Sequence, residues 1–160
     1  MSKSIITIVG PTGIGKTDLS IFLAKSLKSE IISADSRQFY KEIPIGTAAP
    51  SKNELNHIKH HFIHNKSIKE NYSVGEFEME ALSKIRTLHE KYNTLIVVGG
   101  SGLYINSILY GLDNFPKIDS KVRTNLNKDL KDNGIEFLQN ELKNNDALSY
   151  SKIDIKNPHR

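Results

Sequence analysis

The segment GPTGIGKT has the residue types and spacing of a phosphate-binding loop. It fits the pattern G-x-x-x-x-G-K-[ST] and lies between a β-branched apolar segment and a stretch with helical spacing. Glycines let backbone N–H groups turn toward an anion, and the start of the following helix adds partial positive charge. Lys16 would place a cation on the outer phosphate oxygens, and the Thr17 hydroxyl could ligate Mg²⁺. The pattern therefore predicts a polyphosphate site made by Gly10, Pro11, Thr12, Gly13, Ile14, Gly15, Lys16 and Thr17.

Asp35 is the acidic residue best placed to act beside this loop. It follows a short predicted strand at residues 30–33, whereas the predicted strand at 94–98 runs into Gly-Gly-Ser101 without an acid. Ligands of open α/β sheets bind outside the carboxyl ends of the strands, so we expect Asp35 and Ser101 to approach the phosphate loop. Asp35 could alternatively cap a local turn through an Asx hydrogen bond. Its place at a strand end favours catalysis.

The surrounding pattern predicts an α/β fold in which a parallel sheet is flanked by helices. Residues 4–9 (SIITIV) read as a strand buried on both faces, and Leu19, Phe22, Leu23 and Leu27 as the core stripe of the next helix. A capping box at Ser73 predicts the start of another helix. Its expected core stripe is Val74, Phe77, Ala81, Ile85, Leu88 and Tyr92. Strands that alternate with helices indicate a parallel sheet with right-handed crossovers.

The pattern changes near Pro116, after which it is helical only, with a break at Asn133-Gly134. We expect a phosphate-loop α/β core over residues 1–115, a helical extension over 116–156, and a return to the core beginning at 157–160. Asn157-Pro158 is a typical helix opening with two residues left, and three parallel strands are few for a sheet covered on both faces. The sequence is therefore expected to be the N-terminal piece of a longer protein.

Composition excludes several classes of function. The 160 residues contain no Cys, which rules out disulfides, a thiolate nucleophile and Cys-ligated zinc, and fits a cytoplasmic protein. No apolar run approaches the length of a membrane span, so we expect no membrane partner. The net charge of +4 weakly favours a polyanionic partner such as RNA. Four histidines, at 57, 60, 61 and 64, would share one face of a helix; we interpret them as packing and surface residues rather than a metal site.

Six segments resemble the tRNA dimethylallyltransferase family, also called tRNA isopentenyltransferases. They are GPTGIGKT, ISADSRQFY, IGTAAP, HHFI, GGSGLYI and the terminal NPHR, in the family's order and spacing. The resemblance covers essentially the whole chain. The pair formed by DSRQ after the second strand and GG-x-GLY after the third is more specific than the phosphate loop alone. The resemblance implies a P-loop NTPase-like fold with a helical, tRNA-facing extension.

The resemblance also implies an activity and roles for residues. A monomeric enzyme would use Mg²⁺ and transfer the dimethylallyl group of dimethylallyl diphosphate to N6 of the adenosine 3′ of the anticodon in tRNA. The phosphate loop would hold a leaving diphosphate with Mg²⁺ at Thr17. Asp35 would serve as the general base or the orienting acceptor for the adenine N6–H, and Ser101 would assist near the bridging oxygen. The base would have to be flipped into the pocket. The implied tRNA contacts are Asp35, Ser36, Arg37, Gln38, Ser101, Arg123, His159 and Arg160.

Four residues, at three places in the chain, depart from the family pattern. Gly13-Ile14 replaces a common Ala-Ser pair, Ala49 stands where Lys is frequent, and His64 stands where Asp is common. None of these changes removes Lys16, Thr17 or Asp35.

Other functions remain open on the residues alone. A phosphate-loop kinase would use ATP as donor, and ATP could in any case bind the same loop. A close variant of the transferase would prenylate a free adenine nucleotide. A third possibility is a fragment that binds RNA or diphosphate without catalysis, and Arg123 could then be an ordinary charge on a solvated helix.

Overall fold

A parallel β-sheet organises the first of the two units into which the chain divides, Met1–Asp113 and Asn114–Arg160. The computed structural model describes residues 2–113 and 118–158. In spatial order the strands are β1 (Ser4–Val9), β4 (Thr94–Gly99), β2 (Ile31–Ser33) and β3 (His60–His61), all paired in parallel. Their carboxyl ends meet at one edge of the sheet, because Val9 pairs with Gly99 and Ser33 with Val98. The phosphate loop and Asp35 both begin at this edge.

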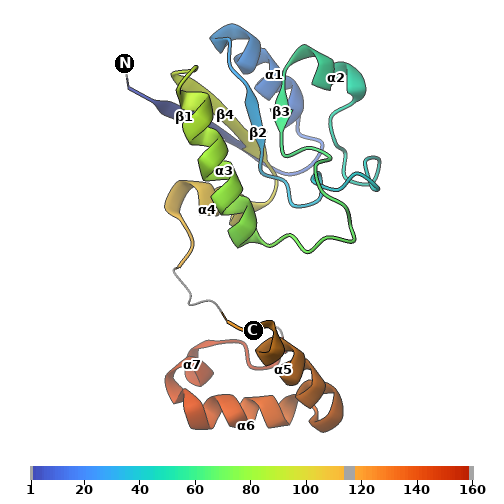
Figure 1. Ribbon diagram of the computed structural model, residues 1–160, viewed down its shortest axis with the longest axis vertical. Helices are drawn as coiled ribbons and strands as arrows, with labels where there is room; N and C mark the ends of the chain where they lie inside the picture. Colours follow the sequence, from blue (N-terminus) through green and yellow to red (C-terminus); the bar gives the residue numbers. More distant parts are fainter. Residues whose placement is uncertain (1, 114–117, 159–160) are drawn as a thin grey trace. The chain divides into compact units, whose positions relative to one another are not determined.

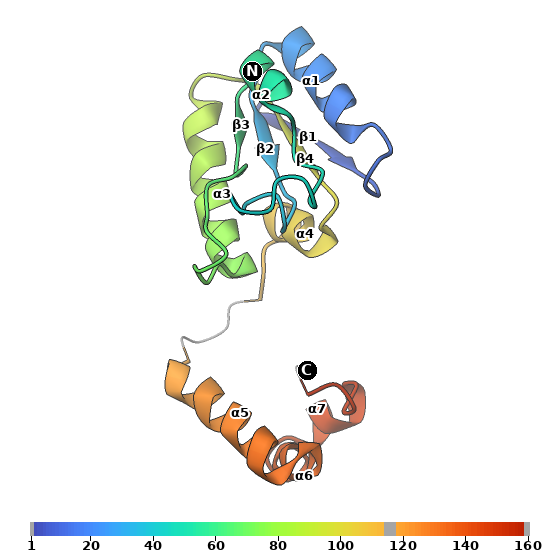
Figure 2. The ribbon, with the colours of Figure 1, turned by 90° about the vertical axis from the view of Figure 1, so that its right-hand side faces the viewer.

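Helices cover both faces of the sheet, as Figures 1 and 2 show. Helix α1 (Lys16–Leu27) packs on one face, and α3 (Val74–His89) and α4 (Gly102–Tyr110) pack on the other. The short α2 (Lys52–His57) leads into β3. The predicted α/β class, a parallel sheet flanked by helices, is confirmed.

The prediction for α3 is also confirmed in its main features. Ser73 accepts a hydrogen bond from the Glu76 backbone N–H, and the Glu76 carboxylate accepts one from the Ser73 N–H at 2.7 Å. These reciprocal bonds satisfy two otherwise free donors at the helix start. Four of the six expected core residues are buried, while Val74 and Tyr92 are half-buried. The buried four are Phe77, Ala81, Ile85 and Leu88.

Two predictions about the start of the chain are wrong. Strand β1 is not buried on both faces: it pairs with β4 alone among the described residues, and Val9 is 61% exposed. The predicted stripe of α1 is likewise not its packed face, because Phe22 is 65% exposed and the residues buried there are Ser20, Ile21 and Ala24. The physical reason is that β1 forms an edge of the sheet, so part of the apolar surface of β1 and α1 is uncovered in this chain.

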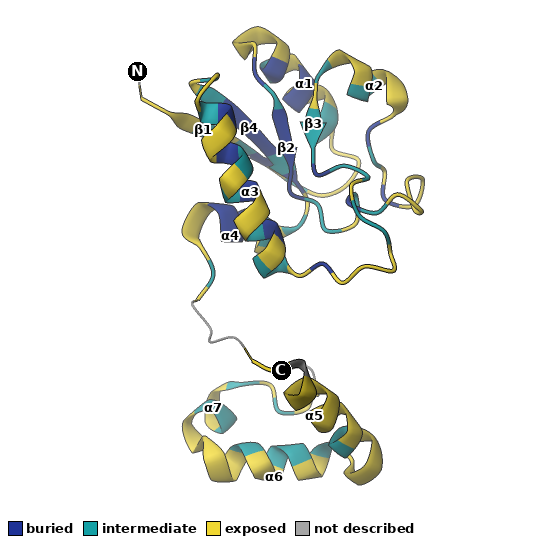
Figure 3. Cartoon of the chain, in the orientation of Figure 1, coloured by how far each residue is buried: buried dark blue, intermediate teal, exposed yellow. Residues whose placement is uncertain are grey.

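Over its described residues, 118–158, the second unit has three helices, α5 (Ser120–Asn133), α6 (Ile135–Asn145) and α7 (Ala147–Lys152). The predicted break after Asn133 is confirmed, since Gly134 separates α5 from α6 with a φ of 77°. The side chain of Gln139 donates a hydrogen bond to the carbonyl of Ile155 at 2.9 Å and so ties the segment after α7 to α6. Residues of this unit that the structure describes are exposed or half-buried (Figure 3).

The predicted domain boundaries stay predictions, because Pro116, His159 and Arg160 lie outside the described residues. Over residues 2–113 and 118–158, no helix combines the length and the apolar character that crossing a membrane requires.

Candidate functional site: two cavities that meet at Asp35

The phosphate loop has the backbone conformation that its glycines predict. Gly13 and Gly15 have φ values of 85° and 92°, in the left-handed region that residues with a Cβ rarely adopt. Gly15 is the N-cap of α1, so the loop leads directly into the start of that helix. The Lys16 ammonium donates to the carbonyl of Pro11 at 2.7 Å and so folds over the loop.

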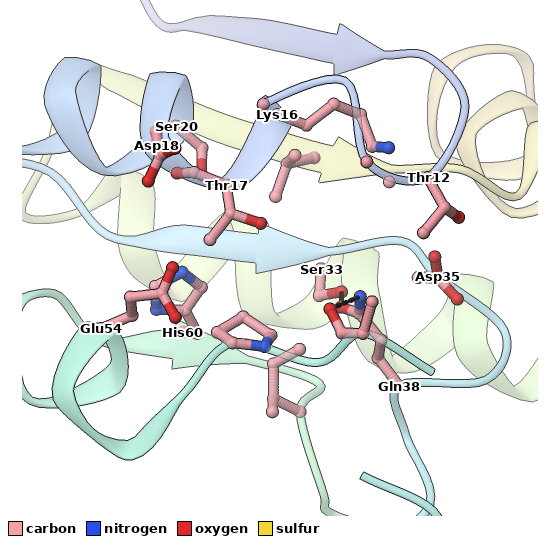
Figure 4. A pocket seen from close by; sticks show the side chains of 17 residues that line it. Thr12, Lys16, Thr17, Asp18, Ser20, Ser33, Asp35, Gln38, Glu54 and His60 are labelled. Atoms are coloured by element: carbon pink, nitrogen blue, oxygen red, sulfur yellow. Dashed lines mark hydrogen bonds between the residues drawn. The ribbon is translucent and has the colours of Figure 1, made fainter. Parts of the chain in front are cut away.

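A cavity of about 210 Å³ lies beside this loop; we call it the phosphate-loop cavity. Figure 4 shows the side chains that line it. The phosphate loop contributes Thr12, Lys16 and Thr17, and Asp35 reaches it from the end of β2. Its remaining walls come from α1, the ends of β2 and β4, residues 48–50, α2 and β3. These elements contribute, among others, Asp18, Ser20, Ser33, Glu54 and His60 to the lining.

Asp35 makes the local turn hydrogen bond that its alternative interpretation required. Its Oδ1 accepts from the backbone N–H of Arg37 at 3.1 Å, an Asx-type contact. This bond occupies one carboxylate oxygen and fixes the direction of the carboxylate. The structure gives no hydrogen-bond partner for Oδ2 among the described residues, so the structural and the chemical interpretations of Asp35 are compatible.

A second cavity, of about 360 Å³, lies on another side of Asp35; we call it the Arg37 cavity. Arg37, Ser36, Gly100 and Ser101 line it, and Thr12 and Asp35 line both cavities. Asp35 is therefore accessible from two spaces that can hold two different groups.

Ser101 joins the ends of β2 and β4 at this point. Its Oγ accepts from the Ser36 backbone N–H at 2.9 Å and lies 3.0 Å from the Ser36 hydroxyl, to which it donates. The ends of β2 and β4 can approach this closely because residue 99 is glycine: a Cβ there would lie 2.2 Å from the carbonyl oxygen of Ala34. This glycine is thus required for the approach that brings Ser101 beside the segment from Asp35 to Ser36.

Aromatic packing around Phe39 and side-chain hydrogen bonds of Gln38 hold the segment after Asp35 in place. Phe39 is fully buried, with its ring 5.2 to 5.5 Å from the rings of Tyr72, Phe77 and Tyr104. Gln38 accepts from the Ser33 hydroxyl at 3.2 Å and donates to the carbonyl oxygens of residues 47 and 48 at 3.4 and 3.3 Å. The Gln38 side chain therefore spans from β2 to the loop that walls the phosphate-loop cavity.

The side chains that line the phosphate-loop cavity carry too little positive charge to neutralise a bound polyphosphate. Among the described residues that line it, Lys16 is the only lysine or arginine, whereas Asp18, Asp35 and Glu54 are acidic. Hydrogen bonds from the Ser51 hydroxyl and backbone N–H lower the pKa of Glu54 and keep it ionised. A bound diphosphate would thus need additional positive charge, which a divalent cation at the Thr17 hydroxyl could supply. No cluster of three or more His, Asp or Glu that could hold a metal occurs in residues 2–113 and 118–158.

The remaining predicted residues lie elsewhere. Arg123 is exposed on α5 in the second unit. His159 and Arg160 are outside the described residues.

Sequence reasoning missed the part of the cavity formed by Glu54 and His60. The histidines do not share a helix face: His57 ends α2, whereas His60 and His61 form β3. A signal for α2 was present, because Ser51 and Glu54 have the same capping-box spacing as Ser73 and Glu76. Nothing in the sequence indicated that α2 and β3 would face the phosphate loop.

Comparison with known proteins identifies relatives of the whole chain. The model of the family described as IPP transferase matches residues 38–160. A tRNA dimethylallyltransferase of Flavobacterium johnsoniae is 58% identical over 98% of this chain, and one of Christiangramia forsetii is 52% identical over all of it. The aligned region covers 50% and 53% of those two proteins, so the chain spans about half the length of the curated relatives it matches.

Solved structures give the same result for the fold. A full-length tRNA isopentenylpyrophosphate transferase from Bacillus halodurans aligns with 100% of this chain at 34% identity and a TM-score of 0.67, over 53% of its own length. A eukaryotic dimethylallyltransferase, described as acting on tRNA, aligns with 99% of the chain at 31% identity and a TM-score of 0.83, over 40% of its own length. The fold is thus the P-loop NTPase-like fold of these enzymes.

Proposed function

This chain belongs to the IPP transferase family, and we propose that it forms the reacting centre of a tRNA dimethylallyltransferase. The reaction is transfer of the dimethylallyl group from dimethylallyl diphosphate to N6 of the adenosine 3′ of the anticodon. The observation that carries the proposal is that Asp35 lines two cavities, one beside the phosphate loop and one beside Arg37. Donor and acceptor can then approach the same carboxylate from different sides.

The donor diphosphate would bind on the backbone N–H groups of the phosphate loop. Lys16, which now donates to its own loop, would turn to the outer phosphate oxygens. Thr17 would hold Mg²⁺, which when bound would supply the positive charge that the acidic lining lacks. The loop therefore serves a leaving group rather than a transferred phosphoryl group.

The acceptor adenine would enter the Arg37 cavity as a base flipped out of its stack. N6 forms a bond to C1 of the dimethylallyl group, the C1–O bond breaks, and its electron pair leaves with the diphosphate. The N6 proton would pass to Oδ2 of Asp35, which has no hydrogen-bond partner in the described part of the chain. The bond from Arg37 N–H to Oδ1 fixes the direction of this carboxylate. A placed general base contributes roughly 10²–10⁴-fold to such a step.

Several further residues would contact the tRNA or position the residues that do. Ser36, Arg37 and Ser101 line the Arg37 cavity, where the acceptor would bind. Gln38 lines the phosphate-loop cavity instead, and it would act on the acceptor side by holding the loop at residues 47 and 48. Arg123, His159 and Arg160 would also contact the RNA. Strand β4 ends at Gly99 and is followed by Gly100 and Ser101, with no acid at this strand end. This is in keeping with transfer of a prenyl rather than a phosphoryl group.

The test is to incubate the protein with an unmodified anticodon stem-loop, Mg²⁺ and dimethylallyl diphosphate, and then to measure the mass of the RNA by mass spectrometry. The chain is assayed alone and joined to the C-terminal half of the Flavobacterium johnsoniae relative, so that a missing half does not hide the activity. We expect a gain of one dimethylallyl group and a loss of at least about 10²-fold in Asp35→Asn. Glu90→Gln, an exposed carboxyl-to-amide change beyond α3, is the matched control and should keep the rate. No gain in either protein, together with ATP-dependent phosphorylation, would contradict the proposal.

A further inference from the structure

His60 contributes a buried ring nitrogen whose hydrogen-bonding capacity is not used. Its Nδ1 lies 2.8 Å from the carbonyl oxygen of Ile58. Because a carbonyl can only accept, Nδ1 carries the hydrogen, and in the neutral ring Nε2 has a free lone pair. Nε2 is inaccessible to solvent and has no hydrogen-bond partner in the described part of the chain. Buried polar atoms without a partner are rare in folded proteins and point to a ligand, a water or a functional role.

The position of His60 connects this nitrogen with the proposed donor site. His60 lines the phosphate-loop cavity together with Thr17 and Glu54. In Figure 4, His60 and Glu54 lie together at the end of the cavity away from Asp35. Glu54 comes from α2 and is held by a capping bond to Ser51, so its carboxylate stays beside the ring.

The charges around His60 determine which form of the ring is stable. Burial favours the neutral ring and lowers its pKa, and the neighbouring His61 acts in the same direction. The hydrogen bond to Ile58 and the charge of Glu54 act in the opposite direction but do not outweigh burial. Across the cavity, Asp18 and Asp35 are acidic and Lys16 is basic. A diphosphate would add further negative charge to this space, and negative charge favours the imidazolium form.

We propose that His60 is a ligand-linked proton site: its ring is neutral in the free protein and takes a proton at Nε2 when an anionic diphosphate occupies the phosphate-loop cavity. The proton comes from solvent, and no covalent bond other than the new N–H changes. It places a second positive charge in a cavity whose lining has Lys16 alone as a fixed cation among the described residues. This inference rests on the proposed binding of a diphosphate in that cavity.

The proposal predicts that diphosphate binding is coupled to pH through one residue. Affinity should weaken as pH rises through the His60 pKa of the complex, by up to about tenfold per pH unit. The cause is proton uptake of up to about one proton per complex.

The experiment is calorimetric titration of the chain with inorganic pyrophosphate and Mg²⁺ near neutral pH, in buffers with different heats of ionisation. The dependence of heat on buffer gives the number of protons taken up, and proton changes of the ligand itself are common to all variants. We expect His60→Gln to take up distinctly fewer protons than the wild type. His64→Gln is the matched control, because His64 Nε2 is also buried without a partner among the described residues but lines neither cavity. It should behave as the wild type.

Nitrogen NMR of the wild-type imidazoles provides a test that needs no variant. The His60 Nε2 signal should be that of an unprotonated nitrogen in the free protein and that of a protonated one with pyrophosphate bound. Pyrophosphate binding with unchanged His60 signals, or equal proton uptake in the wild type and His60→Gln, would overturn the inference while leaving the proposed function intact. Failure of all three proteins to bind pyrophosphate would overturn both.

Discussion

The replacement Gly99→Ala tests how the two strand ends position the candidate site. An ideal Cβ at residue 99 would lie 2.2 Å from the carbonyl oxygen and 2.5 Å from the carbonyl carbon of Ala34. Both are backbone atoms, so no side chain can rotate away to relieve the contact. Reaching even 3.0 Å requires a separation of about 0.8 Å between the ends of β4 and β2. Because Asp35 directly follows Ala34, this shift would also displace Asp35.

The expected effects follow from this displacement. Overpacking of this kind costs about 1–3 kcal/mol, and 2 kcal/mol corresponds to a fall in Tm of roughly 10 °C for a unit of this size. A misplacement of about 1 Å at a reacting group costs on the order of 10²-fold in rate. Thermal unfolding followed by circular dichroism measures the first effect, and the prenyl-transfer assay the second.

Gly102→Ala is the matched control, because no atom lies within 4 Å of a Cβ placed at residue 102. This variant should unfold at the wild-type temperature or slightly above and should keep its rate. The reasoning would be refuted if Gly99→Ala retained both the Tm and the rate of the wild type.

Three further perturbations test separate parts of the account. Ser73→Ala removes the N-terminal cap of α3 and should lower the free energy of unfolding by about 1 kcal/mol in urea titrations; no change would mean that the capping bonds are unimportant. Burial raises the pKa of Glu30, but its hydrogen bonds, first of all that to His61, outweigh burial and hold the pKa below its usual 4.5. The stability advantage of the wild type over Glu30→Gln should therefore be complete above about pH 4.5 and shrink as pH falls, and a constant difference in urea titrations from pH 3 to 7 would contradict this. Lys16→Ala should weaken pyrophosphate binding by roughly 10–100-fold, whereas the exposed Lys91→Ala should not; equal affinities in calorimetry would rule out Lys16 as a phosphate ligand.

Local signals predicted the elements that carry the site. The phosphate loop, the capping box at Ser73 and the break at Gly134 are determined by interactions within a few residues. A short stretch of sequence is therefore enough to predict each of them. The alternation of strands and helices likewise sufficed for the parallel sheet. Asp35 was placed beside the phosphate loop by a general rule for strand ends in α/β sheets.

The failures concern contacts made at long range. Whether Val9 and Phe22 are buried depends on which other elements pack against β1 and α1. The apolar pattern of the segment does not contain this information. The role of His60 depends on α2 and β3 meeting the cavity. The pairing of β3 with β2 over only two residues leaves no recognisable strand pattern in the sequence.

The most direct test of the central claim is to map the two ligands separately by amide chemical shifts. The account predicts that dimethylallyl diphosphate with Mg²⁺ perturbs Gly13, Gly15 and Thr17, that an anticodon stem-loop perturbs Arg37 and Gly100, and that Asp35 responds to both. If the diphosphate perturbed the Arg37 cavity and left the phosphate loop unchanged, or if Asp35 responded to neither, the assignment of donor and acceptor to the two cavities would be wrong.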